Sequence, residues 1–269
     1  MKLESNGKII DLSKKVLIMG ILNVTPDSFS GDGNFIDIET TVNQVKKLLD
    51  DGADIIDVGG QSTRPGYLEI TVEEEINRVV PIIKAISKNF DCLISIDTYR
   101  YQVAEECLKN GAHIVNDIWG LQKDNGEMGK IVSKYSAIVI AMHNKKDKNY
   151  SEDIIESMKK FYQRTFEIAS ENKIERNKII IDPGIGFAKG SKENIEVLLR
   201  LEELISIAPV LLGVSRKKFI GEEMQLSPLE RDDGTLGINI LAITKGVKII
   251  RVHNVRSHKR ALSIVEKLL

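Results

Sequence analysis

The sequence has few features that would place the protein in a membrane or in an oxidising compartment. It contains two cysteines, Cys92 and Cys107, without the spacing of a metal or redox motif. We expect both to be reduced and to act as small buried hydrophobic residues. No apolar run approaches the length that crosses a bilayer, and the first residues lack the apolar core of a signal peptide. These absences predict a cytoplasmic protein with no membrane partner.

An excess of charge of one sign is also missing. The chain carries 38 lysines and arginines against 39 aspartates and glutamates, which gives a net charge of −1. A balanced surface gives no reason to expect a nucleic-acid partner. The 269 residues are ordinary for one eight-fold barrel and can bury a core without disulfides or metals. We therefore expect a single domain over residues 1–269.

Short β-branched runs alternate along the chain with segments of helical period. Continuous apolar runs of this kind are typical of parallel strands that are covered on both faces. The expected strands are Val16–Ile21, Ile55–Val58, Leu93–Ile96, Ile114–Val115, Ile138–Ala141, Ile179–Ile181, Val210–Val214 and Val247–Ile250. Eight such repeats without a linker predict an α/β fold, a closed (β/α)8 TIM barrel. A doubly wound sheet with insertions is an alternative that periodicity leaves open.

The chain begins with a hairpin pattern. Lys2–Ser5 and Lys8–Leu12 flank Asn6-Gly7, a pair typical of a type I′ turn. We expect this N-terminal β-hairpin to cover the bottom of the barrel, away from the chemistry. Further along, Thr71 and Glu74 have the spacing of a capping box that opens a helix.

Polar residues follow six of the eight expected strands. The carboxyl ends of the strands of a (β/α)8 barrel meet at one rim, where the active site lies. Helix caps would explain one or two such residues, but six strands that deliver polar groups to one rim indicate a binding site. The residues are Asn23, Asp97, Asn116, Asp117, Asp182, Ser215, Arg216, Lys217, Arg251 and His253.

The chemistry of this set is specific. Asp97, Asp182 and Asn116 suit a flat heterocycle that has both N–H donors and ring acceptors. Lys217 and Arg251, expected on the opposite side, are cations that hold a phosphate or a polarised carbonyl. The residue types therefore predict a heteroaromatic ring with a phosphorylated arm as the ligand.

Two long loops follow the first two strands. Residues 24–33 and 59–66 are rich in glycine, proline and small polar residues, and Thr63 and Arg64 could meet an anion from above. Such loops are candidate lids, although two solvated turns explain their composition equally well. A lid of this kind would order only when the anion is bound.

Three familiar sites are not expected. Residues 182–190 fail as a dinucleotide loop because Lys189 stands where the third glycine is needed, and the chain has no P-loop pattern. A metallohydrolase barrel would carry His-x-His after the first strand, where this chain has Asn23-Val24-Thr25. His143 and His253 follow strands at the rim, but a tightly held zinc ion is not expected.

In their order along the chain these motifs resemble those of the dihydropteroate synthase family. Each motif alone is modest, whereas the ordered set is specific and spans nearly the whole chain. The matching segments are residues 20–30, 57–66, 95–98, 116–117, 182–187, 215–217 and 251–253.

The resemblance implies an enzyme, a transferase of folate biosynthesis. Members of this family condense 6-hydroxymethyl-7,8-dihydropterin diphosphate with 4-aminobenzoate, release diphosphate and are the targets of sulfonamides. Family members are usually dimeric, so the resemblance also implies a homodimer.

The resemblance also implies roles for individual residues. The pterin would be held by Asp97, Asn116, Asp182 and Lys217. The diphosphate would meet Asn23, Arg251 and His253, with Mg²⁺ as a metal cofactor bridging Asn23 and the leaving group. Val252 is also expected among the substrate-binding residues. Thr63 and Arg64, with residues 27–30, would close over the anion and shape the aminobenzoate pocket beside Ser215 and Arg216. Within this set the catalytic residues would be Asp97, Lys217, Arg251 and His253.

The chain departs from the family pattern at three positions. Gln61 replaces a common Glu, Asn144 a common Met and Asn254 a common Asp. None of these removes a residue assigned to chemistry. A methyltetrahydrofolate:corrinoid methyltransferase would share the pterin carboxylates but lack the motifs at 62–66 and 215–217. A non-catalytic pterin-binding homologue would carry degraded loops. Both alternatives therefore rank behind the synthase.

Overall fold

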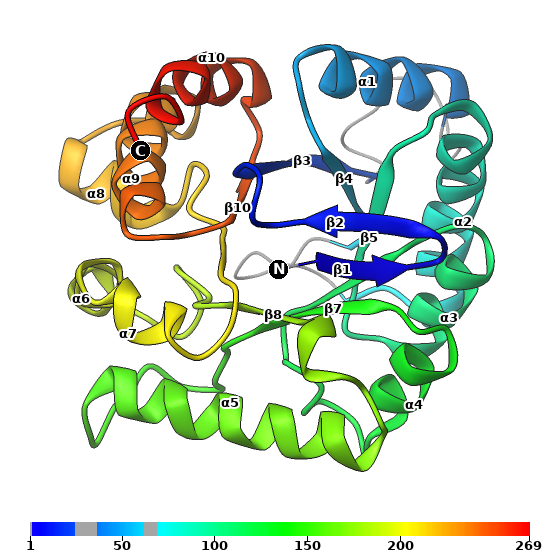
Figure 1. Cartoon of the computed structure of the whole chain (residues 1–269), viewed down its shortest axis with the longest axis horizontal. Helices are drawn as coiled ribbons and strands as arrows, with labels where there is room; N and C mark the ends of the chain where they lie inside the picture. The colour runs from blue at the N-terminus through cyan, green and yellow to red at the C-terminus, as the bar shows by residue number, and fades with distance from the viewer. Residues whose placement is uncertain (1, 25–36, 62–68) are drawn as a thin grey trace.

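Parallel strands alternate with helices around a closed barrel in the computed structural model, which describes residues 2–24, 37–61 and 69–269 (Figure 1). The strands lie in the order β8-β7-β6-β5-β4-β3-β10-β9. A parallel bridge between Ile181 and Val210 joins the two ends of this order, so the sheet closes on itself. The expected (β/α)8 barrel is confirmed, and the doubly wound sheet is excluded.

The barrel strands are β3 (Leu17–Asn23), β4 (Ile55–Gly59), β5 (Leu93–Asp97), β6 (Ile114–Asp117), β7 (Ile138–Met142), β8 (Ile179–Asp182), β9 (Leu211–Leu212) and β10 (Ile249–Val252). The described helices are α1 (Ile38–Asp50), α2 (Val72–Asn89), α3 (Tyr101–Lys109), α4 (Glu127–Lys134), α5 (Ile154–Glu171), α6 (Ser191–Leu199), α7 (Leu201–Ile205), α8 (Lys218–Met224), α9 (Asp232–Thr244) and α10 (Val255–Val265). Two 3₁₀ turns, η2 (Arg176–Lys178) and η3 (Pro228–Arg231), complete the described elements.

Several strands run past the apolar segments that predicted them. Strands β5 and β8 include Asp97 and Asp182 as their last residues, because the parallel pairing with the neighbouring strands continues through them. Gly59, Asp97 and Asn116 are paired in register across three adjacent strands. Asp97, Asn116 and Asp182 are therefore fixed by the sheet itself rather than by loops.

The alternation of side chains along each strand divides the core. Residues that point inward fill the lumen with one apolar cluster, which includes Met19, Ile114, Ile140 and Ile180. Residues that point outward form two larger clusters with the surrounding helices. Each fully buried Ile or Leu contributes roughly 1.5–3 kcal/mol relative to an exposed one. The filled lumen closes the barrel below its carboxyl end.

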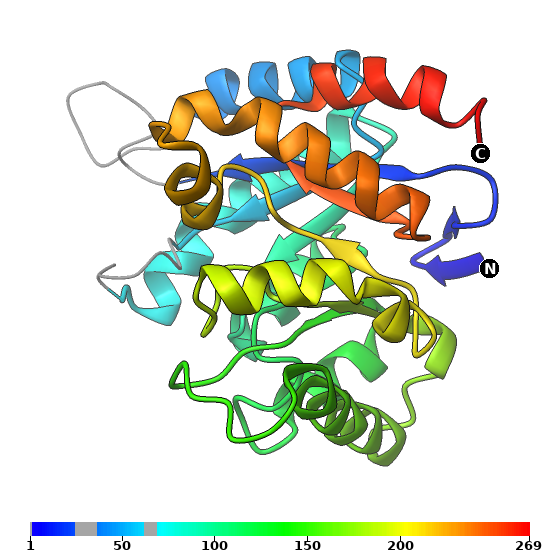
Figure 2. The ribbon, with the colours of Figure 1, turned by 90° about the vertical axis from the view of Figure 1, so that its left-hand side faces the viewer.

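The N-terminal hairpin covers the opposite end of the barrel, as expected (Figures 1 and 2). Strands β1 (Lys2–Ser5) and β2 (Lys8–Asp11) pair antiparallel, and Asn6 and Gly7 have φ of 52° and 76°, as a type I′ turn requires. Leu3, Ile10 and Leu12 belong to the lumen cluster, so the hairpin seals the barrel with apolar side chains.

Local details agree with the sequence in part. The Thr71 hydroxyl accepts the Glu74 N–H at 3.1 Å, which confirms the cap of α2. The Glu74 carboxylate pairs with Arg78, so the reciprocal half of the capping box is replaced by an ion pair. Both cysteines are free, with Cys107 buried and Cys92 half-buried.

Within the described ranges no helix has the length and apolar character of a membrane span.

Candidate active site

Inward-facing residues at the carboxyl ends of the strands form a cluster of charges above the apolar lumen. The guanidinium of Arg251 on β10 lies at its centre. Its Nε donates to Asp57 Oδ2 at 2.6 Å, and its Nη2 donates to Asp97 Oδ2 at 2.7 Å. The sequence placed Arg251 opposite the carboxylates. It lies between two of them instead, because its long side chain reaches across the lumen from β10 to β4 and β5.

Asp57 is a member of this cluster that the sequence analysis did not assign. Its side chain is fully buried, and its Oδ2 also accepts a hydrogen bond from Asn116 Nδ2 at 3.3 Å. Asp57 Oδ1 and the hydroxyl of Ser95, its neighbour in register, have no partner among the described residues. The alternation Ile55, Asp57, Gly59 along β4 was the available signal, since it points Asp57 into the lumen.

Burial dominates the electrostatics of the cluster. Burial raises the pKa of Asp97 to about 7, although Arg251 acts in the opposite direction and the Asp57 charge adds to the rise. Burial alone would lower the pKa of Arg251, but Asp57 and Asp97 raise it, so the guanidinium stays charged. The cluster therefore contains a permanent cation and a carboxyl group that titrates near neutrality.

Asp182 forms the second part of the site, at the end of β8. Its Oδ1 accepts the Gly184 N–H at 2.7 Å, and the Tyr162 hydroxyl donates to its backbone carbonyl at 2.8 Å. Burial raises the pKa of Asp182 to about 6, against the effects of the Gly184 hydrogen bond and of Lys217 and Arg251. The ammonium of Lys217 lies 4.3 Å from the centre of the Phe187 ring, in a cation–π contact. The end of β8 and the loop after it thus present the Asp182 carboxylate and the Phe187 ring, and Lys217 reaches this ring from the segment after β9.

Ser215 and His253 are brought together from the segments that follow β9 and β10. The Ser215 hydroxyl lies 2.9 Å from His253 Nδ1 and accepts the His253 N–H at 3.1 Å. Arg216 points elsewhere, since its guanidinium makes a two-pronged ion pair with Asp232 at 2.7 and 2.9 Å. The side chain of Val252 packs in the outer core, so only the backbone of this predicted site residue faces the rim.

His143 and Asp117, both at the rim in the sequence, have structural roles. His143 is buried within an aromatic cluster with Tyr150, Phe161 and Tyr162, and burial lowers its pKa. The Asp117 carboxylate accepts the N–H groups of Trp119 and Leu121 at 2.9 and 2.7 Å, which fixes the turn after β6.

Asn23 stands at the end of β3, next to the charge cluster. A Cβ placed on Gly59 would lie 4.0 Å from Asn23 Oδ1 and 3.8 Å from Asp97 Oδ2, so both oxygens flank that glycine. Amide and carboxylate oxygens are the ligands that Mg²⁺ prefers, so the residues fit this ion. Among the residues that the structure describes, no three His, Cys, Asp or Glu side chains are grouped to hold a metal.

The predicted contacts of Thr63, Arg64 and residues 27–33 lie outside the described residues. Gln61 and Ile70, on either side of residues 62–68, are linked by a hydrogen bond. Gln61 Oε1 accepts the Ile70 N–H at 3.2 Å, and its Nε2 donates to the Tyr99 hydroxyl at 3.3 Å. Asn254 caps α10 and donates to Asp232 at 3.1 Å. Asn144 Oδ1 accepts the Lys145 N–H at 2.9 Å, so all three departures from the family pattern make hydrogen bonds.

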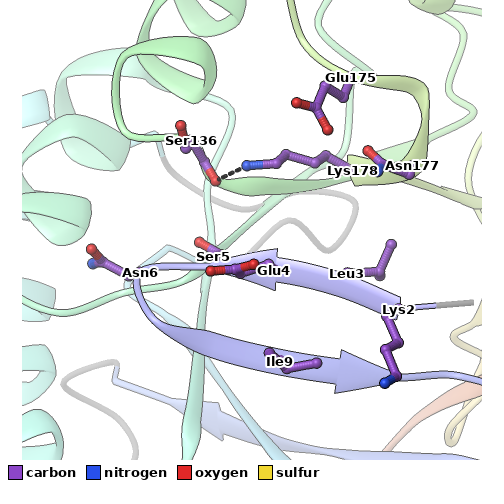
Figure 3. Close-up of a pocket in the computed structure, with 10 residues that line it drawn as sticks. All are labelled: Lys2, Leu3, Glu4, Ser5, Asn6, Ile9, Ser136, Glu175, Asn177 and Lys178. Atoms are coloured by element: carbon purple, nitrogen blue, oxygen red, sulfur yellow. Dashed lines mark hydrogen bonds between the residues drawn. The ribbon is translucent and has the colours of Figure 1, made fainter.

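An open groove of about 430 Å³ lies at the other end of the barrel, between the hairpin and the loops that precede β7 and β8 (Figure 3). Two of its polar side chains bind the protein's own backbone. Lys178 Nζ donates to the Ser136 carbonyl at 2.8 Å, and the Ser5 hydroxyl donates to the His113 carbonyl at 2.7 Å. The apolar lumen separates this groove from the charge cluster, so the carboxyl end is the candidate active site.

Known proteins resemble the chain over almost its entire length. A family model described as pterin binding enzyme matches residues 19–253. Curated dihydropteroate synthases of Clostridium beijerinckii and Bacillus subtilis are 45% and 41% identical to it. The matches cover 97% of this chain in both cases, and 97% and 91% of those proteins.

Solved structures agree. A Clostridium difficile dihydropteroate synthase crystallised in the presence of pteroic acid has a TM-score of 0.93 and 46% identity over 96% of this chain and 98% of its own. A Xanthomonas albilineans dihydropteroate synthase with 4-aminobenzoic acid has a TM-score of 0.93 and 33% identity over 99% and 97%. The chain belongs to the dihydropteroate synthase family of pterin-binding enzymes.

Proposed function

We propose a mechanism for the reaction of this chain, which is a transferase of the dihydropteroate synthase family. In this reaction 6-hydroxymethyl-7,8-dihydropterin diphosphate is joined to 4-aminobenzoate. The observation that carries the proposal is the row of Asp97, Asn116 and Asp182 at one end of a sealed lumen, with Arg251 and Lys217 beside it. The two related structures, one obtained in the presence of pteroic acid and one with 4-aminobenzoic acid, support the choice of substrates.

The pterin ring binds at the carboxylates. Asp182 accepts from the N–H edge of the ring, and Asn116 offers both a donor and an acceptor. Lys217, which lies over Phe187, covers one side of the pocket. Because Asp182 and Asn116 are buried, a ligand without matching groups would desolvate their oxygens that face the pocket without replacing the lost hydrogen bonds, and this penalty makes the pocket selective for pterins.

The bond between the pterin methylene carbon and the diphosphate oxygen breaks, and the electron pair leaves with diphosphate. Asp97 and Asp182 stabilise the positive charge that develops on the pterin, while Arg251 and His253 stabilise the departing anion. Asp57 anchors Arg251 through Nε, and the guanidinium carries further N–H donors for phosphate oxygens. The amine nitrogen of 4-aminobenzoate then bonds to the methylene carbon and releases its proton to water or to diphosphate.

Asn23 would hold Mg²⁺ together with the diphosphate oxygens, and the ion would supply additional positive charge for the leaving group. Thr63, Arg64, Ser215 and the backbone of Val252 complete the proposed set of substrate contacts. Ser215 also holds His253 in place through two hydrogen bonds, one with the ring Nδ1 and one with the backbone N–H. If Thr63 and Arg64 close over the anion and shape the aminobenzoate pocket, this pocket forms only after the pterin diphosphate has bound. We therefore propose ordered binding, with the pterin diphosphate before 4-aminobenzoate.

We also propose that the chain acts as a homodimer in the cytoplasm. Residues 234–244 of α9 carry no charge, and Leu241 on this helix is 50% exposed. An uncharged helix face with exposed apolar side chains is typical of a subunit interface. The free cysteines fit a reducing compartment.

A steady-state assay of diphosphate release tests the function. We expect release from the pterin diphosphate to require 4-aminobenzoate and to equal the dihydropteroate formed. A corrinoid methyltransferase would instead transfer a methyl group from methyltetrahydrofolate. A non-catalytic homologue would bind the pterin without release, and either result would refute the proposal.

A further inference from the structure

A buried lysine lies directly behind the pterin pocket. Lys189 is 3% exposed and lies near the end of the loop that joins Asp182, the last residue of β8, to α6. Long charged side chains are rarely buried unless they are paired. The proposed reaction gives Lys189 no contact with either substrate, so its burial calls for another role.

Three acceptors converge on the Lys189 ammonium. Its Nζ lies 2.9 Å from His143 Nδ1, 3.1 Å from the Phe187 carbonyl and 3.2 Å from the Gly184 carbonyl. A charged lysine has three N–H donors, and these partners use all of them. Two of the partners belong to the loop and the third follows β7, so one side chain ties the loop to the neighbouring strand.

The loop needs such a tie because its backbone is unusual. Gly184, Gly186 and Ala188 have φ of 64°, 83° and 47°, all in the left-handed region. The conformation of Ala188 costs about 1–2 kcal/mol, since its Cβ crowds the following carbonyl. A Cβ on Gly184 would lie 2.1 Å from the His143 carbonyl. The loop is thus pressed against β7, in a shape that turns the carbonyls of Gly184 and Phe187 toward Lys189.

This shape sets both sides of the pterin pocket. The Gly184 N–H binds the Asp182 carboxylate at 2.7 Å, and Phe187 lies 4.3 Å beneath the Lys217 ammonium. A loop that relaxed would therefore move the acceptor for the pterin and the cation above it together.

Lys189 also supplies charge. The charged groups around Asp182 are Lys217, Arg251 and Lys189, each of which lowers its pKa. Around Lys189, burial lowers the pKa to about 7, Asp182 acts against this, and Lys217 and Lys145 add to the lowering. The ring of His143, whose pKa is lowered by burial, contacts the Lys189 ammonium directly.

We propose that Lys189 is a positioning residue for the pterin site, which fixes residues 183–188 in their strained shape and keeps Asp182 ionised as a hydrogen-bond acceptor. This inference rests on the proposed role of Asp182 in pterin binding. Since Asp182 must be ionised, pterin binding is present above its pKa and is lost below it. Removal of the Lys189 charge raises that pKa, so the loss moves to higher pH.

The test is the affinity for the pterin diphosphate, measured by calorimetry between pH 5 and 9, in K189M, K189Q and K189R. At pH 7 we expect K189M to bind about tenfold more weakly, as for the loss of one charge-assisted hydrogen bond, and to recover much of its affinity at pH 9. K189Q should show the same shift, while K189R should keep the midpoint of the wild type. The matched control is K192M, three residues away and exposed on α6, which should leave the profile unchanged.

A purely structural role would lower the thermal midpoint and the affinity equally at every pH, and that result would overturn the proposal. If K189M does not fold, the profiles of K189Q and K189R decide by the same criterion. The D182N variant distinguishes a failure of the proposed role of Lys189 from a failure of the proposed role of Asp182 in pterin binding. If D182N binds the pterin as tightly as the wild type at every pH, the proposed function of the site fails independently of Lys189.

Discussion

The substitution D57N probes the contact that organises the charge cluster. Asp57 Oδ2 accepts from both Arg251 Nε and Asn116 Nδ2, at 2.6 and 3.3 Å, within a fully buried setting. An asparagine of the same shape removes the negative charge that pairs with the Arg251 guanidinium. Removing one partner of a buried ion pair costs about 3–5 kcal/mol. Because Arg251 keeps Asp97, we expect the lower end, about 3 kcal/mol.

The loss should be visible in urea unfolding and in thermal melts. A destabilisation of about 3 kcal/mol corresponds to a decrease in melting temperature of roughly 6–12 °C for a domain of this size. The pH dependence of kcat/KM provides the second readout. The Asp57 charge helps to raise the pKa of Asp97 to about 7. Its removal lowers that pKa, so activity that needs ionised Asp97 should persist to lower pH.

The matched control is D117N. Asp117 is equally buried, but it binds the backbone of its own turn rather than Arg251. D117N should destabilise the protein and leave the acid limb of activity where it is. Our reasoning would be refuted if D57N unfolded like the wild type, or if its acid limb moved to higher pH.

Three further predictions concern the substrate, the metal and the subunit contact. D182A should weaken pterin binding by about 2–4 kcal/mol, since it removes a charged acceptor, and calorimetry against the exposed-site control D233A checks this. Mg²⁺ should bind the free protein weakly and much more tightly with diphosphate, because Asn23 is the proposed protein ligand; tight binding to the free protein would mean that a carboxylate ligand was overlooked. L241E should convert a dimer to monomers in sedimentation experiments, whereas I264E, at a residue of similar exposure on α10, should not; a dimer that persists in L241E would place the interface elsewhere.

The sequence predicted the barrel because eight short apolar runs alternate with segments of helical period, and because polar residues follow six of these runs at the same end. The hairpin followed from Asn6-Gly7, whose φ values match the turn. Position along a strand is a local property, so the carboxylates and the amide at the rim could be assigned to one site.

Contacts across the lumen were beyond such reasoning. The pairing of Arg251 with Asp57 and Asp97 depends on which layers of different strands meet, and therefore on the stagger of the whole barrel. In the sequence, Lys189 was notable only because it stands where a dinucleotide-binding loop needs glycine. Its role could not be predicted, because its three acceptors come together only when the loop folds back. Strand β9 has two residues and is shorter than expected. Its side of the barrel pairs with β8 only through the isolated bridge between Ile181 and Val210, next to Pro209.

The central claim is that a pterin lies at the carboxyl end of the barrel, on the carboxylate of Asp182 and the amide of Asn116. A crystal structure with pteroic acid at saturating concentration tests it most directly. We expect the bicyclic ring within hydrogen-bond distance of both side chains, with Lys217 on one side of it. A ring bound elsewhere, for example in the groove beside the hairpin (Figure 3), with Asp182 untouched, would contradict the claim.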